Sequence, residues 1–324
     1  MKKAKYLVQN DFMADPAVHV FDGKLYIYPS HDRESVIPEN DNGDHFDMVD
    51  YHVFSTSDIE NEPLKDHGVV LNINNIGWAG RQLWDCDVAF KDGRYYMYFP
   101  MKDRTDIFRL GVAISGHPEG PFIPQPDPVR GSYSIDPAVF LDMDGAYYMY
   151  FGGLWGGQLQ RYKDNKALEC AYLPTGNEDA LPSRVVRLSD DMLGFAEEPR
   201  PVILLNPDGS RIKAGQTERR FFEASWMHKY NNKYYFSYST GDTHLLCYAT
   251  GDNPYGPFTY QGVILTPVVG WTTHHAIAEF KGKWYLFHHD CVPSGGKTWL
   301  RSLKVVEMEY NDDGTIRTID GTVI

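Results

Sequence analysis

Asp15-Pro16-Ala17-Val18 decides the fold, because its pattern of a polar residue before an apolar strand recurs along the chain. Each copy is followed by a turn and an aromatic run, as in Asp22-Gly23-Lys24-Leu25-Tyr26-Ile27-Tyr28. Asp-Gly between alternating aromatic runs is typical of a tight β-hairpin, because such turns need residues that tolerate positive φ. The pattern therefore predicts five strand pairs, which begin near Asp15, Asp87, Asp136, Glu223 and His274.

The segments after the hairpins add a third strand and a polar turn to each unit. Two of these turns are nearly identical: His117-Pro118-Glu119-Gly120-Pro121-Phe122 and Asn253-Pro254-Tyr255-Gly256-Pro257-Phe258. Repeated β-units bury their faces by stacking on their neighbours, and radial closure of such units gives a propeller. We therefore expect an all-β fold, a five-bladed β-propeller that forms a single domain over residues 1–324.

The composition of the chain disfavours two classes of binding partner. The formal net charge of −13 disfavours binding to nucleic acid or to an anionic membrane surface, since both require clustered Lys and Arg. No apolar run is long enough for a signal peptide or a membrane-spanning helix. Four widely spaced cysteines predict free thiols. We therefore expect a cytoplasmic protein that binds neither nucleic acid nor membrane.

The repeat also predicts a site. The inner strand of each propeller blade begins on one face of the disc, so the five leading residues should converge on a common pocket. Two separated carboxyl groups, one neutral and one ionised, are what cleavage of a glycosidic bond requires. A third carboxylate nearby would raise the pKa of the acid by charge repulsion. Asp also favours turns at strand starts for local reasons, but five polar leaders in register argue for a shared site.

With these motifs the chain resembles glycoside hydrolase family 43 over essentially its whole length. The resemblance implies that Asp15, in Met13-Ala14-Asp15-Pro16-Ala17-Val18, is the general base of the first blade. It likewise implies that Asp136 is a modulating carboxylate of the third blade and that Glu223 is the general acid of the fourth. These three residues are the predicted catalytic set.

The second and fifth blades carry further resemblances. Trp84-Asp85-Cys86-Asp87-Val88 resembles the Trp-Ala-Pro-Asp-Val segment of the family, so we expect Asp87 to contact substrate, although Asp85-Cys86 departs from Ala-Pro. His274 matches a histidine that the family places on the propeller axis beside a divalent cation, commonly calcium. A calcium ion at His274 is therefore the predicted cofactor; a neutral core histidine is the alternative.

Aromatic residues and one arginine complete the predicted substrate site. Trp78, Trp84 and Trp155 are candidates to stack on sugar rings, although core packing is the more frequent role of tryptophan. Arg301 resembles the last-blade arginine that approaches the base and the substrate hydroxyls in this family; a surface ion pair is the alternative.

The family resemblance implies an enzyme that acts on xylo- or arabino-oligosaccharides. We expect an exo-acting, inverting β-xylosidase that releases xylose from short β-1,4-xylo-oligosaccharides, with α-L-arabinofuranosidase activity in the same pocket. An α-L-arabinofuranosidase or arabinanase is the first alternative, and a non-catalytic carbohydrate-binding propeller is an alternative of another class. A fructan-cleaving hydrolase or a glycoside phosphorylase is less compatible, because the first-blade motif and the acidic leading residues do not suit them. Loops or another subunit would close the pocket, so an oligomer is compatible with the sequence.

Overall fold

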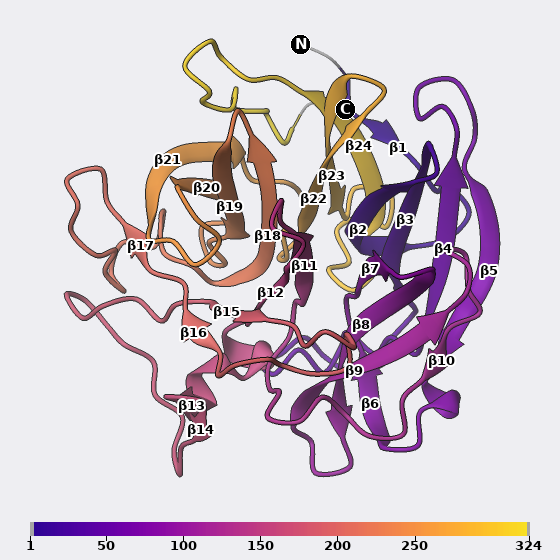
Figure 1. The fold of residues 1–324 in the computed structure, drawn as a ribbon, viewed down its shortest axis with the longest axis horizontal. Helices are drawn as coiled ribbons and strands as arrows, with labels where there is room; N and C mark the ends of the chain where they lie inside the picture. The colour runs from indigo at the N-terminus through magenta and orange to yellow at the C-terminus, as the bar shows by residue number, and fades with distance from the viewer. Residues whose placement is uncertain (1–2, 323–324) are drawn as a thin grey trace.

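The computed structural model describes residues 3–322, whose strands form five sheets around a central axis, as Figure 1 shows. This arrangement confirms the predicted five-bladed β-propeller. No described residue lies in an α-helix; the helical turns are three short 3₁₀ segments: η1 (Ile73–Asn75), η2 (Trp155–Gly157) and η3 (Leu159–Arg161). Among the described residues there is also no helix with the length and apolarity needed to cross a membrane.

The first three blades follow the chain in order. The first blade is built from β2 (Met13–Phe21), β3 (Lys24–His31), β4 (Asp50–Thr56) and β5 (Lys65–Asn72). The second contains β6 (Ala79–Leu83), β7 (Asp87–Lys91), β8 (Arg94–Asp103), β9 (Phe108–Ser115) and β10 (Ile123–Pro124). The third contains β11 (Ala138–Leu141), β12 (Tyr147–Phe151), β15 (Arg184–Arg187) and β16 (Arg200–Pro201). A separate hairpin in the third unit pairs β13 (Tyr162–Lys163) with β14 (Lys166–Ala167).

The last two blades complete the ring. The fourth blade is built from β17 (Leu204–Leu205), β18 (Glu223–Tyr230), β19 (Lys233–Ser239), β20 (Leu246–Gly251) and β21 (Phe258–Leu265). The fifth contains β22 (His275–Phe280), β23 (Lys283–Asp290), β24 (Ser302–Met308) and the N-terminal β1 (Lys5–Tyr6). Because β1 pairs with β24, the start of the chain completes the blade formed by its end.

The first strand of each hairpin is the innermost strand of its blade. These strands, β2, β7, β11, β18 and β22, contact one another in a closed ring. The turns that follow have the predicted backbone: Asp22 and Gly23 have φ of 49° and 73°, which suits a two-residue hairpin turn. This ring brings four of the five leading residues, Asp15, Asp136, Glu223 and His274, to one cavity.

Tyrosines of the second strands join neighbouring blades. The hydroxyl groups of Tyr28 and Tyr150 donate hydrogen bonds to the carbonyl oxygens of Pro118 and Pro254, at 2.8 and 2.6 Å. Both acceptors lie in the duplicated turns of the following blade. The two tyrosine side chains are fully buried, so their phenolic groups need these partners. The repeated tyrosines therefore supply the donors, and the repeated turns the acceptors, of the same kind of contact between blades.

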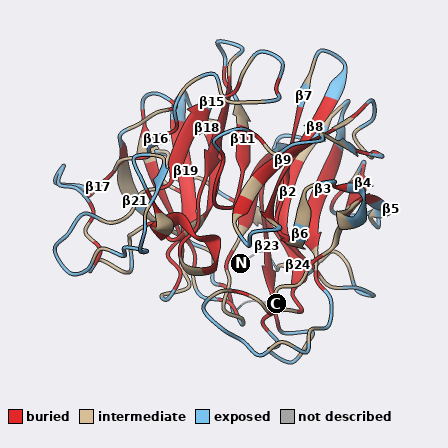
Figure 2. Cartoon of the chain, turned by 90° about the horizontal axis from the view of Figure 1, so that it is seen from below, coloured by how far each residue is buried: buried red, intermediate tan, exposed pale blue. Residues whose placement is uncertain are grey.

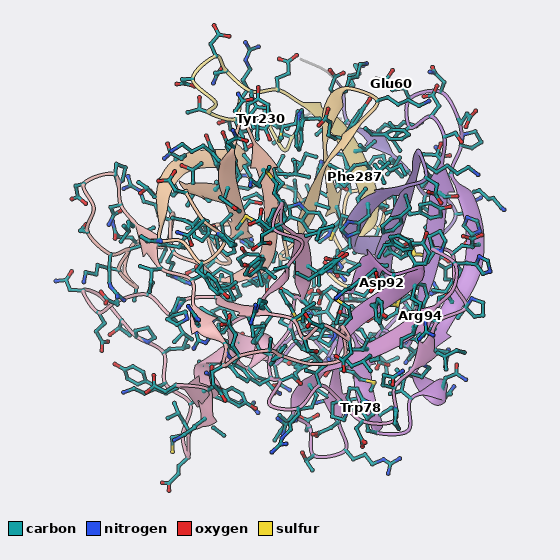
Figure 3. All side chains as sticks on the ribbon, viewed as in Figure 1. Glu60, Trp78, Asp92, Arg94, Tyr230 and Phe287 are labelled. Atoms are coloured by element: carbon teal, nitrogen blue, oxygen red, sulfur yellow. The ribbon has the colours of Figure 1, made fainter. Side chains whose placement is uncertain are left out.

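Buried strands form the middle of the molecule, and exposed residues are concentrated in the loops, as Figure 2 shows. Trp78 belongs to this packing and not to the centre of the ring: Figure 3 shows it at the outer part of the second blade. Its indole stacks on Phe99 with ring centroids 6.2 Å apart. A Cβ atom added at Gly111 would lie 2.4 Å from Phe99 and 2.8 Å from Trp78. Gly111 therefore leaves the space that this aromatic pair fills.

We predict that Gly111→Ala lowers the free energy of unfolding by about 1–3 kcal/mol, because the added methyl group overpacks the ring pair. Urea unfolding followed by tryptophan fluorescence measures this change. Gly116→Ala is the matched control, since Gly116 is exposed and an added Cβ meets no atom within 4 Å. Equal stability of the two variants would contradict the packing assigned to Trp78.

Candidate active site

The inner strands open onto a cavity of about 340 Å³ that all five blades line. Its wall contains the predicted catalytic residues Asp15, Asp136 and Glu223, together with His274. The structure also places Trp84, Trp155 and Arg301 in this wall. Seven of the nine predicted site residues thus meet in one place, although they come from distant parts of the sequence.

The backbone is irregular at the carboxylates. The pairing of β2 with β3 shifts between Ala14 and Ala17, so Asp15 and Pro16 form a bulge. Proline cannot donate to a strand ladder, which makes a bulge the suitable place for an Asp-Pro pair. Asp15 and Asp136 have φ of 45° and 58°, conformations that are unusual for residues other than glycine. Such strain is found where function fixes a side chain.

Asp15 lies in a cationic environment. Its Oδ1 accepts a hydrogen bond from Arg301 Nη1 at 2.6 Å, and its backbone N–H donates to His289 Nδ1 at 3.2 Å. Burial alone would raise the pKa of Asp15, but the charge of Arg301, helped by His289 and His274, lowers it to about 2. Asp15 is therefore ionised at neutral pH.

Asp32 holds Arg301 from the opposite side. The carboxylate accepts from Arg301 Nε at 2.8 Å and from Nη2 at 2.7 Å, and it also accepts from the Arg301 backbone N–H at 2.8 Å. A planar guanidinium matches a carboxylate in this two-pronged geometry. Both side chains are buried. Asp32 thus fixes the guanidinium that contacts the predicted base.

Glu223 has the opposite environment. It is half-buried at the start of β18, and it has no cationic partner within ion-pair distance in the part of the chain that the structure describes. Burial raises the pKa of Glu223 well above its usual value, and the charges of Asp136 and Asp15 raise it further. This environment favours the protonated form of Glu223, which is the form that a general acid needs.

Asp136 joins the third and fourth blades beside this acid. Its Oδ2 accepts a hydrogen bond of 2.5 Å from the backbone N–H of Ala224, the residue that follows Glu223. Ala224 has φ of 60° and lies where the pairing of β18 with β19 shifts. Asp136 therefore fixes the bulge that presents Glu223, in addition to raising the pKa of its carboxyl group.

Asp85 is a fourth buried carboxyl group in the cavity wall. Its carboxyl group shares a hydrogen bond with Asp136, and burial together with the Asp136 charge raises the pKa of Asp85 well above its usual value. Among the described residues, its buried Oδ1 has no hydrogen-bond donor beside it. In the sequence, the departure of Asp85-Cys86 from Ala-Pro is the one signal that sets Asp85 apart.

Asp87 lies elsewhere. Its carboxylate bonds His19 Nε2 at 2.5 Å and the backbone N–H of Val139 at 2.5 Å, and only 1% of the residue is exposed. It does not line the cavity. The prediction that Asp87 contacts substrate is therefore not supported: its two oxygens are used to tie β7 to β2 and β11. Trp78, packed on Phe99, is likewise outside the cavity wall.

Aromatic side chains form the apolar part of the wall. Trp155, in η2, lies 5.3 Å from Trp271 and 5.3 Å from Phe222, measured between ring centroids. Trp84 donates from Nε1 to the carbonyl oxygen of Phe46 at 2.8 Å. Phe46 comes from the loop between β3 and β4, and its ring lies 4.9 Å from the guanidinium of Arg301. This loop has no periodic pattern, so its part in the cavity could not be predicted.

Residues 5–316 match the family described as Glycosyl hydrolases family 43, which agrees with a cavity lined by carboxyl groups. The chain belongs to glycoside hydrolase family 43. It is 76% identical over 317 residues to a xylosidase/arabinosidase of Bacteroides ovatus, with 98% of each chain covered. The enzyme is therefore a glycoside hydrolase, as its sequence predicted.

Solved structures of this family have the same fold. The structure of RS223-Beta-xylosidase matches with a TM-score of 0.98 and 73% identity, over 99% of this chain and 100% of that one. A GH43 β-xylosidase/α-arabinofuranosidase from a compost microbial metagenome matches with a TM-score of 0.97 and 58% identity, over 99% and 98% of the two chains. That protein was solved in complex with xylotriose, in a calcium-free form.

We predict that Arg301→Met moves the acidic limb of the kcat/KM profile to higher pH. The Arg301 charge favours the ionised form of Asp15, so its removal raises the pKa of Asp15 from about 2, and Asp15 becomes protonated at a higher pH. Initial rates on an aryl β-xyloside at a series of pH values measure the shift. Arg301→Lys retains the charge and is the control; the same profile for wild type and Arg301→Met would contradict the pairing.

Proposed function

We propose that this enzyme is an exo-acting β-xylosidase that releases xylose from short β-1,4-xylo-oligosaccharides. The observation that carries the proposal is the contrast between two carboxyl groups in one cavity: the pKa of Asp15 is lowered to about 2, and the pKa of Glu223 is raised. An ionised base and a neutral acid are the pair that glycoside hydrolysis requires. The names of the similar proteins support xylose as the sugar released.

The proposed reaction is a single displacement with inversion. Glu223 donates its proton to the oxygen of the leaving group, while Asp15 takes a proton from a water molecule that attacks the anomeric carbon from the opposite face. This mechanism requires carboxyl groups about 6.5 to 9.5 Å apart, to leave room for the water. Arg301 and Asp136 hold the two groups in place and keep their pKa values apart.

α-L-Arabinofuranosidase activity is a second candidate for the same cavity. Two similar proteins have names that join xylosidase with arabinosidase or arabinofuranosidase activity. Xylopyranose and arabinofuranose are pentosyl groups of the same composition, so one small cavity could accept either ring. The ratio of kcat/KM values on aryl β-xyloside and aryl α-L-arabinofuranoside ranks the two activities.

We predict that Glu223→Gln lowers the hydrolysis of xylobiose by about 10²- to 10⁴-fold, because the amide cannot donate the proton that the leaving sugar needs. An aryl xyloside with a good leaving group should lose much less, since it leaves without protonation. Xylose release from the two substrates measures the difference. Glu218→Gln, at an exposed position in the same segment, is the control; equal losses on both substrates would contradict the assignment of the acid.

We also propose that a divalent cation, calcium, binds at His274. Ligand atoms of His274, Asp85 and Asp136 lie within 4.8 Å of one another. Oδ1 of Asp85, which has no hydrogen-bond partner among residues 3–322, fits such an ion, because calcium prefers carboxylate oxygens and a buried oxygen without a partner is costly. When bound, the ion would supply positive charge among the crowded carboxyl groups.

We predict that Asp85→Asn weakens calcium binding at least about tenfold, or about 1.4 kcal/mol, because it removes an anionic ligand. Calorimetric titration of chelator-treated protein with CaCl₂ measures the affinity directly. Asp41→Asn, at the exposed rim of the cavity, is the matched control. Unchanged affinity in Asp85→Asn would rule out this ligand, and unchanged turnover after chelation would rule out a catalytic role for the cation.

A further inference from the structure

A second cluster of possible metal ligands lies on the first blade, outside the catalytic cavity. It consists of His31 at the end of β3 and of Asp50 and His52 on the neighbouring β4. Ligand atoms of the three side chains lie within 4.8 Å of one another. None of them lines the catalytic cavity, and none is needed for the chemistry proposed above.

The three side chains face one another closely. The imidazole rings of His31 and His52 have centroids 4.8 Å apart and are tilted by 68°. Asp50 Oδ1 lies 2.5 Å from His31 Nδ1. The side chains are 21%, 14% and 15% exposed for His31, Asp50 and His52, respectively. An ion could therefore reach them from solvent, while much of their surface is already held by the protein.

Each of the two imidazole rings also has a carboxylate from outside the cluster beside one of its nitrogens. Asp11 Oδ2 lies 3.2 Å from His31 Nε2, and Asp66 Oδ1 lies 3.1 Å from His52 Nδ1. Histidines that bind metals usually donate their other ring N–H to a carboxylate or carbonyl group, which fixes the ring and its tautomer. These contacts occupy Nε2 of His31 and Nδ1 of His52. An ion would then bind Nε2 of His52 and Nδ1 of His31, the nitrogen that contacts Asp50.

We propose that His31, Asp50 and His52 form a binding site for a divalent transition-metal ion of the zinc type. Two imidazole nitrogens and one carboxylate are a set that binds zinc, with water in the open position. The ion would replace the contact between His31 and Asp50 and bond both side chains. Calcium prefers oxygen ligands, so the donor set separates this site from the one at His274.

The position of the cluster gives the ion a structural effect. His31 pairs with Met13 at the end of β3, and Asp50 begins β4 on the other side of the same strand. Asp32 follows His31 in the chain. Its backbone N–H donates to the carbonyl oxygen of Phe12, and its carboxylate accepts a hydrogen bond from Arg301. A bound ion would therefore join β3 to β4 at the end of the blade that supports the catalytic arginine, and it should stabilise the folded state by mass action.

Calorimetric titration of the chelator-treated full-length protein with ZnCl₂ tests the proposal. We expect zinc binding that is at least about tenfold weaker in both His52→Gln and Asp50→Asn. The same titration with CaCl₂ should be unaffected by either change. His117→Gln, which removes an exposed histidine from another blade, is the matched control and should bind zinc like the wild type.

Three further measurements make the result decisive. Titrations repeated in a His274→Gln background exclude zinc bound at the central cavity, and the loss in His52→Gln should persist there. Co²⁺ absorption in the visible range should report imidazole coordination and should also disappear in His52→Gln. Thermal unfolding in chelator checks that the variants fold. Equal zinc affinity in the wild type and in folded His52→Gln, or no zinc binding by the wild type in this background, would overturn the proposal and leave a cluster of ion pairs.

Discussion

The contact of Arg301 with Asp15 and Asp32 is the interaction on which the catalytic site depends. A guanidinium buried between two carboxylates is tolerated only when its donors are well paired. Here Asp32 accepts from Nε and Nη2 of the guanidinium and also from the backbone N–H of Arg301. The remaining donor, Nη1, is directed at Asp15. One cation thus decides which of several crowded carboxyl groups carries the negative charge.

The other carboxyl groups respond to that charge distribution. The charges of Asp136 and Asp15 both raise the pKa of Glu223, and no described residue forms an ion pair with it. Asp85 shares a hydrogen bond with Asp136 and is also pushed towards its neutral form. The propeller makes this arrangement possible, because a closed ring of inner strands brings carboxyl groups from four blades to one cavity. Tyrosine hydrogen bonds join neighbouring blades of that ring.

Features repeated in the sequence could be predicted. The hairpin turns and the aromatic runs gave the five blades, and the motifs at the strand starts indicated Asp15, Asp136 and Glu223, which the structure brings together. The resemblance to the family also indicated Arg301 and His274. Their chemical roles remain predictions, since placement in one cavity does not by itself show which group donates and which accepts a proton.

The features that could not be predicted depend on irregular segments or on contacts between distant residues. Asp87 stands at the position of the family motif, but it begins β7 and its carboxylate lies between blades. Asp85, which departs from the motif, lines the cavity instead. Asp32 and Phe46 belong to loops with no period, and their contacts with Arg301 span more than 250 residues of sequence. Trp78 lies in a Gly-flanked segment, and its packing depends on distant partners, because it stacks on Phe99 in the space beside Gly111.

The stereochemistry of the first product tests the division of labour between Asp15 and Glu223 most directly. Proton NMR during the first minutes of hydrolysis of an aryl β-D-xyloside identifies the anomer of xylose before mutarotation. The leaving group of this substrate is not a sugar, so all the xylose observed comes from the glycosyl group that is cleaved. A water activated by Asp15 and a proton from Glu223 should give α-xylose first. Initial formation of β-xylose would show that a carboxylate attacks the sugar directly, and would contradict Asp15 as a general base.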